Sequence, residues 1–191
     1  DTAKKVCEYG ADYIGFVFYN PSPRNLSAKS AAQLATNVPK NISRVGLFVN
    51  PSDEELSSVL ELVDLDLIQL HGQEIPERVS EIRRFTGLPI LKAIKISGAR
   101  DLKSADDYFS VADQLLFDSK APVTLKNSLP GGNALIFDWK LLQGASIPIP
   151  WMLAGGLNAN NIVEAISTSG ATAIDTSSGV EKIFGIKDVA L

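Results

Sequence analysis

The chain has 191 residues, 45% of them hydrophobic and 21% charged, and a formal net charge of −4. This composition predicts one globular domain over residues 1–191, and the acidic balance excludes a nucleic acid or a membrane surface as an electrostatic partner. Apolar runs stay below the roughly 18 residues of a membrane span, no signal peptide is recognised, and Cys7 is the single cysteine, so we expect a cytoplasmic protein without disulfides.

The predicted elements alternate along the chain. A first helix over residues 1–9 is followed by nearly continuous apolar runs, which predict buried strands, at 13–18, 44–49, 65–71, 89–96, 114–118, 150–155 and 172–175. Residues 28–38, 53–63 and 160–168 have helical apolar spacing and follow the capping candidates Ser27, Ser52 and Asn158 or Asn160. A further helix is expected to begin at 186. This alternation predicts right-handed βαβ units and a parallel sheet.

The number of predicted strands and helices indicates whether the sheet closes into a barrel. Seven strands and about seven helices approach the eight of each in a (β/α)8 TIM barrel. We therefore expect an α/β fold of that barrel type, with the first strand and most of the last helix outside this sequence. The alternative is an open sheet.

Two loops after the last predicted strands are rich in small residues. They are residues 154–158 (AGGLN) and 175–179 (DTSSG). Glycines let an anion approach backbone N–H groups, and Asn158 and Ser178 are expected near helix N-termini. Each loop alone is also typical of an ordinary tight turn, but the pair predicts a phosphate site formed by Gly155, Gly156, Ser177, Ser178 and Gly179.

Several motifs in one order closely resemble the phosphoribosylanthranilate isomerase family. They are GADYIGFVF (10–18), PSPR (21–24), VGLFVN (45–50), LIQLHG (67–72), LFD (116–118), FDW (137–139), LAGGL (153–157) and DTSSGVE (175–181). The resemblance runs through essentially the whole chain. It implies a (β/α)8 barrel of tryptophan biosynthesis that needs no metal or cofactor and converts N-(5-phosphoribosyl)anthranilate to the corresponding 1-deoxyribulose phosphate.

That reaction is an Amadori rearrangement, which needs an acid to protonate the furanose ring oxygen and a base to remove the C2′ proton. By the resemblance Asp118 is the acid, Arg24 contacts the anthranilate carboxylate, and Asp175 contacts the sugar hydroxyls or the reacting portion. His71, at the end of its strand, is a candidate for lining the site. Without the resemblance, Asp118 could cap a loop, Arg24 could be a solvated surface residue, and local hydrogen bonds could satisfy His71.

The family's base is a cysteine in a Lys-Ile-Cys-Gly type motif, which this sequence lacks. Cys7 falls on the apolar face of the first predicted helix, where we expect it to pack as a small hydrophobe. A chain with only these residues is therefore expected to bind its ligand better than it converts it.

Two further positions have structural interpretations. Ala134 replaces the last glycine of the family's glycine loop, at a cost of about 1 kcal/mol if that position needs a positive φ. Asp138 is expected to cap a helix over residues 139–143.

Two other functions remain alternatives at this point. A related phosphosugar barrel such as indole-glycerol-phosphate synthase would need catalytic lysines, for which Lys92 and Lys95 are the candidates. A catalytically silent phosphate-binding barrel would fit the missing base. The sequence leaves monomer and homodimer open.

Overall fold

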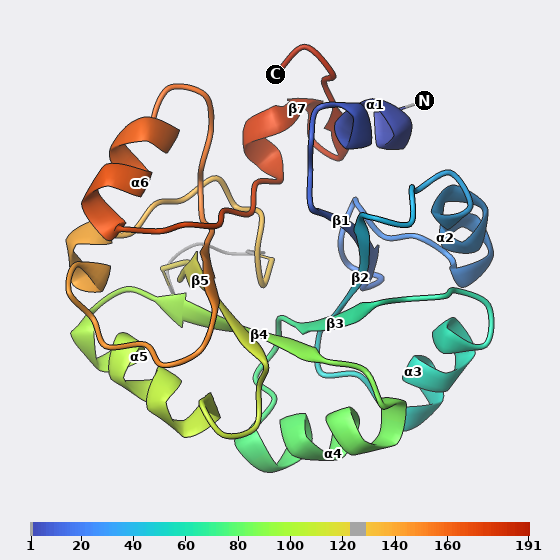
Figure 1. Ribbon diagram of the computed structural model, residues 1–191, viewed down its shortest axis with the longest axis horizontal. Helices are drawn as coiled ribbons and strands as arrows, with labels where there is room; N and C mark the ends of the chain where they lie inside the picture. Colours follow the sequence, from blue (N-terminus) through green and yellow to red (C-terminus); the bar gives the residue numbers. More distant parts are fainter. Residues whose placement is uncertain (1, 123–128) are drawn as a thin grey trace.

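The computed structural model describes residues 2–122 and 129–191. Its helices form a ring around the strands, as Figure 1 shows. The strands are β1 (Tyr13–Phe18), β2 (Ser43–Phe48), β3 (Leu67–Leu70), β4 (Ile90–Ile96), β5 (Gln114–Ser119), β6 (Trp151–Leu153), β7 (Glu181–Ile183) and β8 (Ile186–Lys187). The α-helices are α1 (Thr2–Glu8), α2 (Ala28–Ala35), α3 (Asp53–Leu60), α4 (Pro76–Thr86), α5 (Ala99–Lys103) and α6 (Ile162–Ser169). The 3₁₀ helices in the described ranges are η1 (Ser104–Tyr108), η2 (Trp139–Leu142) and η3 (Ser178–Val180).

The strands β1 to β6 form one parallel sheet in sequence order. Each strand pairs with the next one along the chain, which confirms the predicted βαβ series. Because the strands are parallel, their carboxyl ends meet at one edge of the curled sheet. The loops that carry the predicted site residues lie at this edge.

Two predicted elements differ from the structure. Residues 172–175 do not form a named strand. Ile174 pairs with Leu153 of β6 as an isolated parallel bridge, because the backbone hydrogen bonds here are those of Leu153 with Ala173 and Asp175. The prediction that a helix begins at residue 186 is wrong, because residue 186 begins β8, which forms an antiparallel hairpin with β7. Gly185 lies between them at φ 87°, a conformation that glycine adopts readily and that turns the chain back on itself.

The helix starts confirm part of the capping prediction. Ser27 caps α2, and Ser52 forms a capping box with Glu55 at the start of α3. The predicted caps Asn158 and Asn160 precede α6, but the N-cap position belongs to Asn161. The first predicted helix is α1, and residue 1 lies outside the described residues.

Both faces of the sheet are buried. The interior face is filled by Val45, Leu67, Leu91, Ala93, Leu116, Met152 and Ala154. The outer face packs against the helices in a larger core that includes Phe16, Ile68, Ile94, Phe117 and Leu153. This explains why the strand sequences are nearly continuously apolar.

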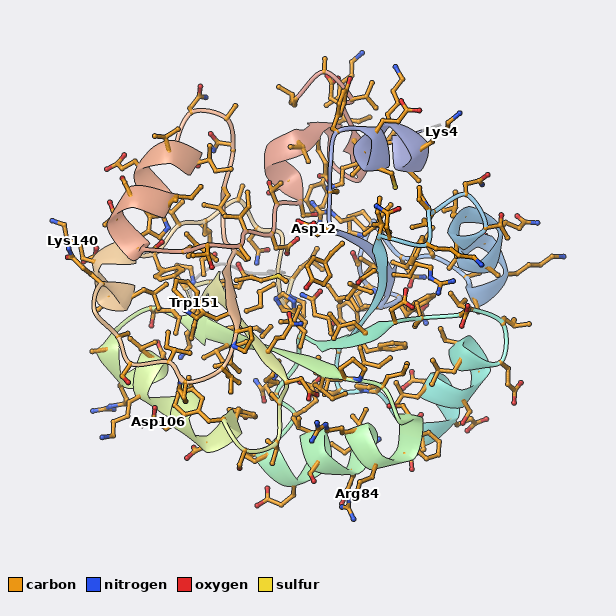
Figure 2. The ribbon with its side chains drawn as sticks, in the orientation of Figure 1. Lys4, Asp12, Arg84, Asp106, Lys140 and Trp151 are labelled. Atoms are coloured by element: carbon orange, nitrogen blue, oxygen red, sulfur yellow. The ribbon has the colours of Figure 1, made fainter. Side chains whose placement is uncertain are left out.

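Charged side chains are confined mainly to the outside of the helix ring. Figure 2 shows Lys4, Arg84, Asp106 and Lys140 pointing outward from it. The longest helix that the structure describes, α4, has 11 residues, and none in the described ranges has the length and apolarity to cross a bilayer.

Candidate functional site

A pocket of about 680 Å³, counting space open to solvent, lies at the carboxyl ends of the strands. Eight of the nine predicted site residues line it: Arg24, His71, Asp118, Gly155, Gly156, Asp175, Ser177 and Ser178. These residues come from five separate segments of the chain. The structure thus brings the predicted acid, the predicted carboxylate ligand and the predicted phosphate loops into one cavity.

Asp118 and His71 form the polar centre of the pocket, and both are buried. His71 Nε2 lies 3.0 Å from Asp118 Oδ2, and His71 Nδ1 lies 3.1 Å from the amide nitrogen of Gln69. An amide nitrogen is a donor, so Nδ1 accepts and Nε2 carries the proton that it donates to Asp118. The backbone N–H of Ser119 donates to the other carboxylate oxygen, Oδ1, at 2.8 Å.

Glycines allow the backbone to approach this centre closely. A Cβ on Gly131 would lie 2.7 Å from His71 Nε2, and one on Gly155 would lie 3.0 Å from Asp118 Oδ1. The two glycines therefore leave the space that the His71–Asp118 pair occupies.

The predicted phosphate loops present free hydrogen-bond donors. Gly155, Gly156, Ser177 and Ser178 line the pocket, and their backbone N–H groups donate to no acceptor among the described residues. Gly155 and Gly156 have φ values of 89° and 63°, so they turn the chain immediately after β6. Unpaired N–H groups that converge on a cavity are suited to an anion.

Side chains behind the first loop hold its carbonyl groups. The amide nitrogens of Asn158 and Asn161 both donate to the carbonyl oxygen of Gly156, at 3.1 and 2.9 Å. The hydroxyl of Thr176 donates to the carbonyl oxygen of Leu157 at 2.9 Å. These bonds join the two loops and engage oxygens that would otherwise repel a phosphate.

Gly179 is the one predicted phosphate residue that does not line the pocket. A Cβ at this position would overlap the carbonyl oxygen of Leu157 and lie 2.8 Å from its carbonyl carbon. Glycine at this position lets the two loops approach, and direct contact of Gly179 with a phosphate stays a prediction. Ser178 begins η3, which has only three residues.

Asp175 lines the same pocket. Loss of solvation and the neighbouring charge of Asp118 raise its pKa, while His71 and Lys187 act in the opposite direction. The pocket thus holds two carboxyl groups, of which Asp175 retains its proton to higher pH than an ordinary aspartate.

Arg24 makes a bidentate ion pair that sequence reasoning missed. Its Nε and Nη2 lie 2.7 and 2.8 Å from Oε1 and Oε2 of Glu181. The side chains are 11% and 3% exposed, so Arg24 is not the solvated surface residue of the alternative interpretation. Gln69 was also missed, although its position two residues before His71 places both on the same face of the strand.

Three other candidates lie outside the pocket lining. Cys7 is in α1, and burial raises the pKa of its thiol. Lys92 is held in a buried ion pair, with its Nζ 2.8 Å from Glu74 Oε2. Burial and the charge of Lys92 lower the pKa of Lys95. Because neither lysine lines the pocket, the arrangement gives no support to a lysine-dependent reaction.

The structure answers the question raised by Ala134, whose φ is 56°. Replacing Ala134 with glycine is expected to raise the free energy of unfolding by about 0.5–1 kcal/mol, because the strain of a left-handed alanine is relieved and only partly offset by the entropy of a more flexible unfolded chain. Urea denaturation measures the change. Ala99→Gly is the matched control at an exposed helical alanine, where the same substitution should destabilise. A loss of stability in both variants would contradict the prediction.

Asp138 behaves as predicted. It caps η2, and its carboxylate accepts from the backbone N–H of Lys140 at 3.1 Å.

Comparisons with known proteins agree in one family. The profile of the family described as N-(5'phosphoribosyl)anthranilate (PRA) isomerase matches residues 1–191. The N-(5'-phosphoribosyl)anthranilate isomerase of Paramagnetospirillum magneticum is 52% identical over 188 residues, which cover 98% of this chain and 86% of that protein. The one from Rhodospirillum centenum is 53% identical, covering 95% of this chain and 85% of that protein.

Solved structures give the same result. The phosphoribosyl anthranilate isomerase of Thermotoga maritima is 35% identical with a TM-score of 0.83, covering 98% of this chain and 86% of that one. A phosphoribosyl anthranilate isomerase in complex with reduced 1-(o-carboxyphenylamino)-1-deoxyribulose 5-phosphate is 33% identical with a TM-score of 0.80, at the same coverage.

Proposed function

The chain belongs to the N-(5'-phosphoribosyl)anthranilate isomerase family, an isomerase family of tryptophan biosynthesis, and from this premise we propose how its pocket holds the substrate. The phosphate binds the N–H groups of the loops at Gly155 to Gly156 and Ser177 to Ser178, and the anthranilate carboxylate binds Arg24. The ligand named for the solved relative carries a phosphate and a carboxylate. The observation that carries this proposal is that four residues lining the pocket have backbone N–H groups that donate to no described acceptor.

Asp118 is the proposed proton donor to the furanose ring oxygen. Transfer of its proton breaks the ring C1′–O bond and leaves a Schiff base between C1′ and the anthranilate nitrogen. Loss of the C2′ proton to a base then gives the enolamine, which tautomerises to the ketose. The carboxylate formed on Asp118 accepts from His71 Nε2 and from the N–H of Ser119, and these hydrogen bonds stabilise it.

Asp175 and Cys7 receive different assignments. Asp175, which lines the pocket with Asp118, is proposed to hydrogen-bond the sugar hydroxyls. Cys7 is given no part in proton transfer, because it lies in α1 away from the pocket lining and its raised pKa disfavours the thiolate.

Assembly and location are part of the same proposal. A relative from Thermotoga maritima is described as a dimeric enzyme that was also obtained as monomers, and we propose that this chain is a monomer or a homodimer. A single cysteine is consistent with a reducing, cytoplasmic location.

The phosphate assignment is tested at Ser178. Ser178→Asp is expected to weaken inhibition of the isomerase by inorganic phosphate by about tenfold or more, because it places a negative charge where the phosphate binds. Ser178→Asn has a similar size without the charge and should change the inhibition constant only a few-fold. Equal effects of both variants would show that charge at this loop does not matter and would overturn the assignment.

A further inference from the structure

The Glu181 carboxylate accepts four hydrogen bonds, two of them from Arg24, which lines the pocket. Besides the two bonds from Arg24, it accepts from the backbone N–H of Gly185 at 3.1 Å and from Lys187 Nζ at 3.3 Å. Burial alone would raise its pKa, but the bonds from Arg24 and Gly185 and the charge of Lys187 outweigh burial and lower the pKa. Glu181 is therefore an anion at neutral pH.

The contact leaves one edge of the Arg24 guanidinium free. A guanidinium has five N–H donors, and Glu181 uses the side edge formed by Nε and Nη2. Nη1 donates to no other described residue, and it faces Gly132, where a Cβ would lie only 2.6 Å from it. Glu181 therefore does not engage Nη1, and Arg24 lines the pocket.

The hairpin of β7 and β8 supports Arg24 from a second direction. Phe184, at its turn, places its ring 4.7 Å from the guanidinium carbon, within the range of a cation–π contact. Lys187 of the same hairpin donates to the carbonyl oxygen of Ser177 at 2.6 Å. One hairpin therefore connects the proposed carboxylate ligand with the proposed phosphate loop.

We propose that Glu181 is a positioning residue that fixes the free edge of Arg24 toward the pocket, so that the hairpin sets the spacing between the two anionic ends of the substrate. This inference rests on the proposed function, in which Arg24 binds the anthranilate carboxylate. An arginine held on one edge loses less side-chain freedom when it binds with the other.

Glu181→Gln tests the proposal with two separate probes, anthranilate and inorganic phosphate, as inhibitors of the isomerase. We expect the inhibition constant for anthranilate and the KM to rise about tenfold, while kcat and the phosphate constant stay within about threefold. Glu164→Gln, at an exposed glutamate of α6, is the matched control and should change none of them. Tighter anthranilate binding would overturn the proposal, since Glu181 would then be a competitor for Arg24.

Two further variants separate the possible failures. Arg24→Leu should weaken anthranilate binding, and adding Glu181→Gln to it should have no further effect, as expected for residues that act through one contact. If Arg24→Leu leaves anthranilate binding unchanged, the proposed function fails. If Arg24→Leu weakens anthranilate binding but Glu181→Gln leaves it unchanged, the positioning role of Glu181 fails while the proposed function stands.

Phe184→Leu, at an exposed side chain, gives an independent measurement should Glu181→Gln not fold, and we expect about threefold weaker anthranilate binding. No change would overturn the role of the hairpin.

Discussion

Replacing Asp118 with asparagine is expected to lower kcat of the isomerase by about 10²–10⁴-fold, the usual contribution of a general acid. Asparagine keeps the shape of the side chain but has no carboxyl proton to give to the ring oxygen. Binding of the reduced product analogue, measured by calorimetry, should change only a few-fold, because the proposed phosphate and carboxylate contacts are made by other residues of the pocket.

The matched control is Asp138→Asn. Asp138 caps η2 outside the pocket lining, and asparagine is an equally good cap, so both kcat and stability should remain close to those of the unmodified protein. Turnover that survives Asp118→Asn would remove Asp118 from the role of acid. It would then direct attention to Asp175, the other carboxyl group in the pocket.

Gly179→Ala is expected to destabilise the protein by about 1–3 kcal/mol, the usual cost of an added methyl in a packed site. The new methyl would overlap the Leu157 carbonyl, and a backbone group cannot rotate away as a side chain can. The two phosphate loops should therefore separate, and inhibition by inorganic phosphate should weaken by at least about tenfold. Urea denaturation and the inhibition constant measure the two effects.

Gly98→Ala is the control for this substitution. Gly98 has an extended backbone, with φ −169°, and nothing lies within 4 Å of an added Cβ. Its replacement should leave phosphate inhibition unchanged. If Gly179→Ala binds phosphate as well as Gly98→Ala does, close approach of the loops is not what forms the anion site.

Local sequence patterns determined much of this protein. Continuous apolar runs predicted the six strands of the parallel sheet, because strands buried on both faces need apolar side chains on both. A polar residue at the end of such a run, as at Asp118, has to lie at the carboxyl edge of the sheet. Strand ends and loop composition together with the family resemblance named nine site residues, and eight of them line the pocket.

The C-terminal hairpin shows where local patterns failed. Residues 186–191 had the position of the next helix in an alternating chain, yet residues 181–187 pair as two short antiparallel strands. The turn at Gly185 and the contacts of Glu181 and Lys187 outweigh the alternation.

The sequence by itself thus determined the βαβ alternation, the edge of the sheet that carries the site, and most of the residues there. Only the tertiary structure decided which of them touch. Arg24 and Glu181 are separated by 157 positions and His71 and Asp118 by 47, and contacts over such separations depend on sheet register and loop path. Those are properties of the whole packed chain, because no pattern of neighbouring residues specifies the distance between segments that meet only after folding.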